Sequence, residues 1–379
     1  MKKRKILSAF AALVVLLTPA LTGCSGEKPA TDPNNPLLVA VSQSSDQSSV
    51  QPSETVSEPV STVEPSTQVS DTSTESIPDI SQPSAEPSAD VSQSSSPAEA
   101  ITPALWKAEN ADGNSIYLMG SIHMGDSDVN YMPDYITSAY ALSDSIAVEA
   151  DISVYLDNSA KALELMSLIR YDDGTTIKDH ISEETYNKAV ERLTAFNMYS
   201  PLYDTFKAYM WQSLLTNTFK DTRGLDVYHG VDYMFLKKAQ ADNKSIIEIE
   251  SMEEQIELFG SYSDELTDLI LSQMLEDNYA EYASASERAL YEAWKQGKLD
   301  EALLYSTNFS DTDNISDPLY QEYFEKMIYT RNRTMADAAE QYIESGQKVF
   351  VLVGAFHYVG NKGIISLLEN DGYTVTRVG

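Results

Sequence analysis

Two histidines close matching patterns in this chain of 379 residues. Residues 115–123 form an apolar run that ends in Gly-Ser-Ile-His, with His123 last. Residues 348–357 form a second apolar run that ends in Gly-Ala-Phe-His, with His357 last. In both, a glycine three residues earlier removes a side chain where the backbone leaves the predicted strand. Because ligands collect at strand ends in α/β sheets, the two imidazoles are predicted to face a common site.

Imidazole is a common ligand of divalent metals, so the paired motif predicts a metal site. For one histidine alone, a hydrogen-bonded structural role would be the ordinary interpretation. The repetition of the Gly-x-x-His pattern at equivalent positions of two similar units favours the metal site. The other two histidines, His180 and His229, lie in polar, loop-like stretches and are interpreted as surface residues.

Glu149 follows the apolar run 145–148 and is the first candidate carboxylate. A buried carboxylate is costly unless it meets a metal, a cation or hydrogen-bond donors. We interpret Glu149 as a metal ligand or general base, and the alternative is a solvated strand end. Asp151 would point to the same face if the strand continued. Glu248 and Glu250 alternate with isoleucines, so either one reaches the site or both cover a solvated face.

Arg331 and Asn332 precede the last predicted central helix. Arg331 can bind a carboxylate or stabilise a developing oxyanion there, and the alternative is a surface cation in an acidic protein. Asp232 opens a helix and is interpreted as an N-terminal acid that matches the helix dipole.

The surrounding stretches predict the elements that position these residues. Both histidine units read as strand, Gly-x-x-His, loop, helix and strand, a weak internal duplication over residues 115–149 and 348–378. The sequence predicts an α/β domain with a small central sheet built from these two similar units and a largely helical insertion between them. Further predicted elements are helices over residues 133–142, 182–196, 251 onward and 334–346, with Leu142 and Phe196 facing inward, and a strand over 245–250.

The N-terminus predicts export. Basic residues 2–5 and an apolar run over residues 6–20 form a signal peptide too short for a comfortable membrane span. The run ends in Leu-Thr-Gly followed by Cys24, the only cysteine of the chain. We predict a lipoprotein signal peptide over residues 1–23 and lipidation of Cys24, which anchors the chain at the extracytoplasmic face of a membrane. The alternative is an ordinary signal peptide or an uncleaved anchor.

Residues 25–100 hold no aromatic residue and few large apolar ones. Such a composition cannot offset chain entropy, so residues 24–100 are predicted to be the lipidated cysteine and a disordered linker, with one folded domain over 101–379. The formal net charge of −32 disfavours nucleic acid as a partner.

Several short segments of the folded domain match a known family together. They are residues 117–123, 147–151, 249–251 with Gln255, 331–332 with Met335, and 353–357 with Gly360, Gly363, Leu367, Gly372, Tyr373 and Val375. Together they resemble the TraB/PrgY/GumN family, which includes the TIKI proteins, metal-dependent proteases that act on Wnt. The resemblance implies a fold like the erythromycin-esterase/ChaN group and a site of His123, Glu149, Arg331 and His357. Ile249 and Ser251 depart mildly from the family's Leu and Thr.

Two functions are compatible with these residues. In the first, the chain is a divalent-metal-dependent, peptidase-like hydrolase with ligands His123, His357 and Glu149, and the metal is Mn or Co rather than Zn. Its substrates would be extracytoplasmic peptides or cell-envelope material. In the second, the same cleft binds or sequesters a peptide signal without cutting it. The sequence leaves the substrate and the oligomeric state open.

Overall fold

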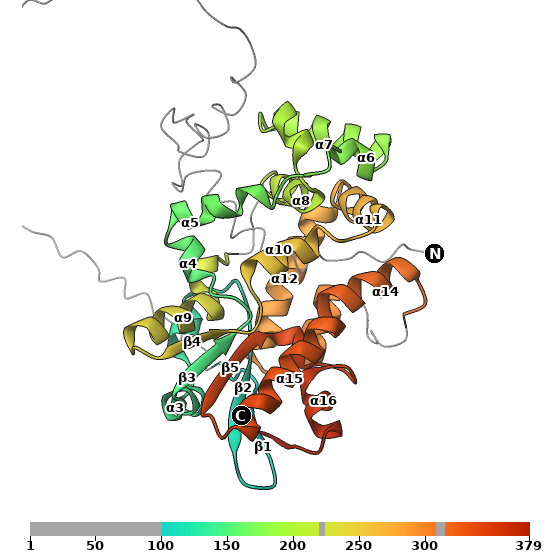
Figure 1. Cartoon of the computed structure of the whole chain (residues 1–379). Helices are drawn as coiled ribbons and strands as arrows, with labels where there is room; N and C mark the ends of the chain where they lie inside the picture. The colour runs from blue at the N-terminus through green and yellow to red at the C-terminus, as the bar shows by residue number, and fades with distance from the viewer. Residues whose placement is uncertain (1–100, 220–223, 308–314) are drawn as a thin grey trace, which may run out of the picture.

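The computed structural model describes residues 101–219, 224–307 and 315–379. The predicted signal peptide, Cys24 and the linker through residue 100 lie outside the described residues. Within them the chain forms a mixed six-stranded sheet with many helices, which confirms the predicted α/β class (Figure 1). None of the helices in these ranges is long and apolar enough to cross a bilayer.

The two motif strands lie side by side at the centre of the sheet, whose order is β4-β3-β5-β2-β1-β6. β2 and β5 are parallel, and Ser121 pairs with Gly354. Both are almost entirely buried, as expected of parallel strands covered on two faces. The strands are β1 (Leu105–Glu109), β2 (Ser115–Ser121), β3 (Ser145–Val148), β4 (Ser245–Glu248), β5 (Val349–Gly354) and β6 (Thr374–Arg377).

The two similar units lead away from this centre in opposite directions. From β2, helix α3 (Asp134–Leu142) leads to β3, which lies beyond β5. From β5, helix α16 (Ile364–Asn370) leads to β6, which lies beyond β1. Right-handed crossovers in opposite directions place their helices on opposite faces of a sheet. Figure 1 accordingly shows α3 on one side of the sheet and α16 on the other.

Aromatic packing fixes the face that α3 covers. Phe350 of β5 stacks on Phe235 of α9 (Val231–Ala241) with ring centroids 5.3 Å apart. Tyr140 of α3 meets the same Phe350 ring edge-on. On the opposite face, α15 (Thr330–Glu344) packs against α16. The sheet is therefore held between α3 and α9 on one side and α15 and α16 on the other.

The helical insertion keeps most predicted helices but shifts some residues. Ser182 caps its helix and Ser251 forms a capping box with Glu254, as expected. Leu142 and Phe196 end their helices and are exposed, contrary to the expected inward face. The insertion and its flanks contain η1 (Ser127–Tyr131), α4 (Ser153–Leu156), α5 (Ser159–Glu164), η2 (Leu165–Ser167), α6 (Ile177–His180), α7 (Glu183–Ala195), η3 (Pro201–Thr205), α8 (Ala208–Thr216), η4 (Val227–His229), α10 (Met252–Phe259), α11 (Asp264–Met274), α12 (Tyr279–Lys295), α13 (Leu299–Thr307), α14 (Pro318–Phe324), the π-helical η5 (Glu325–Tyr329) and, after β5, η6 (Ala355–Tyr358).

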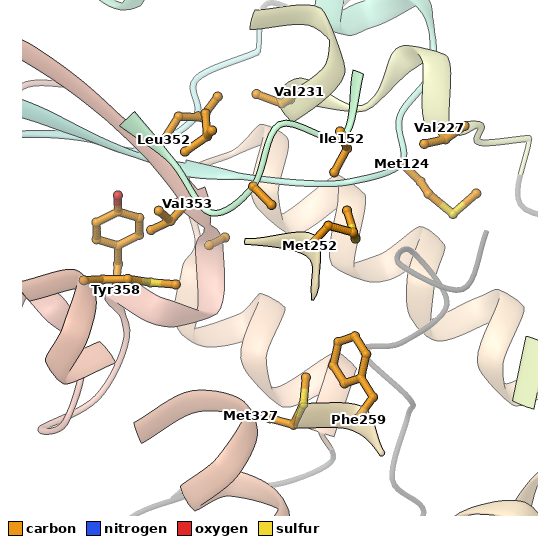
Figure 2. Packing of buried hydrophobic residues seen from close by; sticks show 14 of the residues in the cluster. Met124, Ile152, Val227, Val231, Met252, Phe259, Met327, Leu352, Val353 and Tyr358 are labelled. Carbon is orange, nitrogen blue, oxygen red and sulfur yellow. The ribbon is translucent and has the colours of Figure 1, made fainter. Parts of the chain in front are cut away.

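The apolar core continues up to the segments that carry the candidate site. Met124 follows His123, Met252 begins α10, and Met327 lies one turn before Arg331. All three methionines are buried, and Figure 2 shows Met327 beside Phe259 and Met124 beside Val227. Unbranched thioether side chains adapt to irregular spaces, so they fill the core around polar residues well.

The two histidine motifs touch each other through Gly120. A Cβ added at Gly120 would lie 2.9 Å from the Cα of Ala355, the residue after the second motif's glycine. The carbonyl of Gly120 accepts a hydrogen bond of 2.9 Å from the buried indole of Trp294. The first glycine is therefore a close-packing residue that sets the distance between the two motifs.

Gly120→Ala is expected to lower the free energy of unfolding by about 1–3 kcal/mol, because the added methyl group overpacks the core. Gly260→Ala is the matched control, since a Cβ there meets the flexible Lys207 side chain at 3.1 Å. Urea unfolding followed by circular dichroism measures both. Wild-type stability in Gly120→Ala would show that the two motifs are not closely packed at this place.

Candidate functional site

Glu149 lies at the carboxyl edge of the sheet, directly after β3. Its Oε1 atom accepts a hydrogen bond of 2.6 Å from the backbone N–H of Gly354. Its Oε2 atom accepts from Arg331 Nη2 at 2.5 Å and from Gln255 Nε2 at 3.2 Å. A Cβ on Gly354 would stand 3.0 Å from Oε1 and 3.4 Å from the His357 ring. The second motif's glycine thus makes room for the carboxylate and the imidazole.

Arg331 is buried and binds two carboxylates at once. Besides Glu149, its Nε and Nη2 atoms donate to Glu250 at 2.8 Å each. Its Nη1 atom donates to the carbonyl of Met327 at 3.1 Å. With a side chain only 10% exposed, it is not the surface cation of the alternative interpretation. The guanidinium is engaged on every nitrogen, and it holds Glu149 in place.

The charge of Glu149 is fixed by this neighbourhood. Burial opposes ionisation, but the neighbouring groups, above all the Arg331 guanidinium, together outweigh it and hold the pKa of Glu149 well below its ordinary value. His357, His123 and the Gly354 N–H act in the same direction. The carboxylate is therefore ionised at neutral pH.

His357 is oriented by an amide. Its Nδ1 atom lies 2.6 Å from Oδ1 of the fully buried Asn332, whose Nδ2 donates to the Lys362 carbonyl at 2.7 Å. Because the amide N–H₂ is used by Lys362, its oxygen must face the ring, so Nδ1–H donates to it. Burial, with Arg331 nearby, lowers the pKa of His357 to about 3. The ring is neutral and Nε2 carries a lone pair, 3.5 Å from Glu149 Oε1.

His123 is oriented by a carboxylate instead. Its Nδ1 atom lies 2.8 Å from Oδ2 of Asp232, in the first turn of α9. The side chain is 37% exposed, against 10% for that of Asp232. Burial opposes the charge of His123, but Asp232 outweighs it and raises the pKa of His123 to about 9, with Glu149 adding to the effect. The carboxylate of Glu149 thus acts on both histidines.

Close backbone contacts place His123 beside α9. Val231 N–H donates to the carbonyl of Ile122 at 2.8 Å. A Cβ on Gly230 would stand only 2.2 Å from the His123 carbonyl oxygen. The start of α9 therefore lies directly against the motif, which positions Asp232 for the imidazole.

Both histidines are thus anchored through Nδ1, which leaves Nε2 as the free nitrogen of each. Metal-binding histidines show this pattern, with the second ring nitrogen held by a carboxylate or another acceptor. His357 Nε2 and Glu149 Oε1, 3.5 Å apart, match two tetrahedral ligands at about 2.1 Å from one metal, whose mutual distance is about 3.4 Å. In residues 101–219, 224–307 and 315–379, no three His, Cys, Asp or Glu side chains are already grouped closely enough to hold an ion. His357 and Glu149 have the donor chemistry of a divalent-metal site, and His123 would have to lose its proton to act as a third ligand.

The remaining candidates lie outside this cluster. Asp151 accepts from the N–H of Ser153, and Glu248 accepts from the N–H of Asp151 at 2.7 Å, so both stabilise the turn after β3. His180 stacks on Tyr171 and bonds Asp264, and His229 bonds Asp226.

Four residues that contact the cluster were not assigned to the candidate site by the sequence analysis. Asp232 was interpreted only as a helix-dipole acid, and Glu250 was left between the site and a solvated face. Gln255, which bridges Glu149 and Glu250, appeared only as a match to a family segment, and Asn332 was named beside Arg331 without a role of its own. The adjacency of Asn332 to Arg331 was the one local signal, because neighbouring residues at a helix start can serve one site.

Fold and site together define an α/β protein with a buried carboxylate–arginine–histidine cluster at the carboxyl edge of a mixed sheet. Residues 104–377 match the TraB/PrgY/gumN family, and the chain belongs to it. It is similar to the uncharacterized protein YbaP of Escherichia coli K12 and of Shigella flexneri, each 28% identical over 140 residues. These matches cover 37% of this chain and 50% of each relative, so the chain spans about half the length of the curated relatives it matches. No solved structure shows a significant match.

Proposed function

We propose that this chain is a divalent-metal-dependent hydrolase of the peptidase type, with His123, Glu149 and His357 as ligands. One observation carries the proposal. A neutral His357 Nε2 lone pair and an ionised Glu149 oxygen face each other at 3.5 Å, with the ring proton on the other nitrogen. Two electron-rich atoms repel each other in a buried site unless a cation lies between them. A divalent ion at this place removes the repulsion.

The chain's own residues supply the rest of the chemistry. A divalent metal polarises a carbonyl group and makes water nucleophilic near neutral pH. Asn332 holds the His357 imidazole in the tautomer that presents Nε2, and Asp232 would hold the His123 ring in the same way once it gives up its proton. Arg331 keeps Glu149 ionised, so that it can bind a cation, and the same low pKa makes the carboxylate weaker as a proton acceptor than as a metal ligand. We propose Mn or Co rather than Zn as the metal, and the carboxylate of the donor set is a ligand type that suits Mn.

We also propose the cellular setting that the sequence predicts. The chain would be a lipoprotein attached through Cys24 at the extracytoplasmic face of a membrane, with peptides or envelope material as substrates. The fold would be related to the erythromycin-esterase/ChaN group, a proposal supported by the two adjacent, parallel strand–Gly-x-x-His units.

Cleavage assays test the hydrolase. The full chain is purified, stripped of metal with EDTA and incubated with a peptide library, with Mn, Co, Zn or no metal added, and products are read by mass spectrometry. Metal-stimulated cleavage is expected in the wild type and in His229→Ala, whose histidine bonds only Asp226 near the surface. In His357→Ala, cleavage should be abolished.

Two outcomes would contradict the proposal. Cleavage that persists undiminished in EDTA would remove the metal from the reaction. Peptide binding at low micromolar concentration without cleavage under any metal would identify a binding or sequestering protein instead.

A further inference from the structure

Ser121, the last residue of β2, has a buried hydroxyl that the fold does not use. The residue is 2% exposed, and its Oγ atom has no hydrogen-bond partner within the part of the chain that the structure describes. Burying a hydroxyl without a partner is unfavourable, and such groups in native proteins call for an explanation.

The strand register places this hydroxyl beside the candidate site. Ser121 pairs with Gly354 across the parallel β2–β5 ladder, so their side-chain positions point to the same face about 4.8 Å apart. At Gly354, that position is bounded by Glu149 Oε1 at 3.0 Å and by the His357 ring at 3.4 Å. Glu149 approaches from β3, on one side of β5, and Ser121 stands on β2, on the other.

The missing side chain at Gly354 leaves nothing on β5 between these groups. A β5 side chain at this place would separate Ser121 from Glu149 and His357, and a glycine cannot. The neighbouring side chains of β2 and β5 at the lower levels of the sheet are apolar and buried, such as Met119 and Leu352. Ser121 is therefore the first polar side chain of β2 on this face below His123.

We propose that Ser121 belongs to the active site and that its hydroxyl hydrogen-bonds the reacting oxygen, either water or the substrate carbonyl, held over Gly354. The proposal rests on the hydrolase function proposed above and adds a residue to it. Ser121 forms no covalent bond in this role. It orients an oxygen atom through one hydrogen bond, which neutral hydroxyl groups provide as donor or acceptor.

The variant Ser121→Ala is expected to behave differently if Ser121 is only structural than if it belongs to the active site. If the hydroxyl is only buried, Ser121→Ala removes an unpaired polar group and changes stability without touching activity. If the hydroxyl takes part in the reaction, the same variant is more stable and cleaves more slowly, because active-site groups often lower stability while they support function.

The test measures both properties on the full chain. In Ser121→Ala, Tm is expected to rise by about 2–4 °C. Its kcat should fall about 10- to 100-fold with KM little changed, as when one hydrogen bond to the reacting group is lost. Ser121→Thr keeps the hydroxyl and should restore most of kcat. Ser143→Ala is the control, because Ser143 is buried but donates to the Ala139 carbonyl at 3.0 Å; it should lower Tm and leave kcat unchanged.

An unchanged kcat in Ser121→Ala would overturn the role of Ser121. So would a fall of kcat in Ser121→Thr as large as that in Ser121→Ala, if the Tm of Ser121→Thr equals that of the wild type. Neither result would contradict the proposed hydrolase function. If the wild type cleaves nothing with any metal, the hydrolase itself fails. Ser121 is then judged by the dissociation constant of a library peptide that the wild type binds. A tenfold weakening in Ser121→Ala, reversed in Ser121→Thr, supports contact with the ligand. An unchanged constant, or a wild type that binds no peptide of the library, overturns it.

Discussion

Replacing Arg331 with methionine is expected to destabilise the domain by about 3–5 kcal/mol, because it leaves two buried carboxylates without their counter-ion. Glu149 and Glu250 each have side chains only 12% exposed, and Arg331 binds both. Methionine fills the space of the aliphatic stem of arginine and carries no charge, so the loss consists mainly of the lost ion pairs. Urea unfolding at neutral pH measures the difference.

Arg333→Met is the matched control for this variant. Arg333 lies two residues further along the same helix and pairs with Glu325, but its side chain is 55% exposed. Exposed ion pairs contribute about 0–1 kcal/mol, so this variant should remain close to the wild type. Equal effects of the two variants would show that the buried cluster carries no special share of the stability.

The stability of Arg331→Met is also expected to depend on pH differently from that of the wild type. With its pKa held below the ordinary 4.5, Glu149 contributes stability in the wild type that is fully present above pH 4.5 and lost as the pH falls further. In Arg331→Met, burial without the cation raises the pKa of Glu149, and protonation relieves the unpaired charge. The stability gap between the two proteins should therefore narrow on acidification, and a gap that stays constant or widens would contradict this account.

The second large effect is expected on metal affinity. His357→Ala removes a proposed ligand and should weaken binding of Mn or Co by more than 100-fold, beyond the effect of any residue that only orients a ligand. Asn332→Ala removes the partner of His357 Nδ1 and should weaken it by about 10- to 100-fold. Isothermal titration calorimetry on the metal-stripped chain measures both dissociation constants.

His229→Ala gives the baseline of this series. His229 bonds Asp226 through Nδ1, as His123 bonds Asp232, so its imidazole is held by a carboxylate that does not belong to the cluster. Its removal should leave metal affinity unchanged. An order in which Asn332→Ala weakens binding more than His357→Ala would mean that His357 is not a ligand and that the ion is held elsewhere.

Local patterns were enough to find the main strands and the two histidine motifs. Uninterrupted apolar runs of parallel strands are distinctive, and their repetition indicated that β2 and β5 are related before their pairing was visible. Capping residues located the starts of α7 and α10, because a helix cap is formed by four consecutive residues and can be recognised in the sequence. Burial of Arg331 was not predictable this way, because its carboxylate partners come from the segments directly after β3 and β4.

The remaining differences arise from contacts between distant segments. β1 is short and only partly buried, so its pattern is weak until β2 and β6 pair with it. Helix α15 begins at Thr330 rather than Thr334, because the π-helical η5 joins it to α14 without a break. The interpretation of Asp232 as a helix-dipole acid used only its position at the helix start. Its hydrogen bond to His123 depends on how α9 packs against the end of β2.

The central pair of strands joins segments that lie far apart along the chain. β2 begins at Ser115, whereas β5 ends at Gly354, near the C-terminus. During synthesis, Glu149 and His123 emerge long before Gly354, Asn332 and His357 exist. A nascent or truncated chain therefore cannot assemble the cluster, and contacts of such long sequence separation form slowly. The cluster can therefore form only after β5 and the segment that follows it have been synthesised and have paired with β2 and β3.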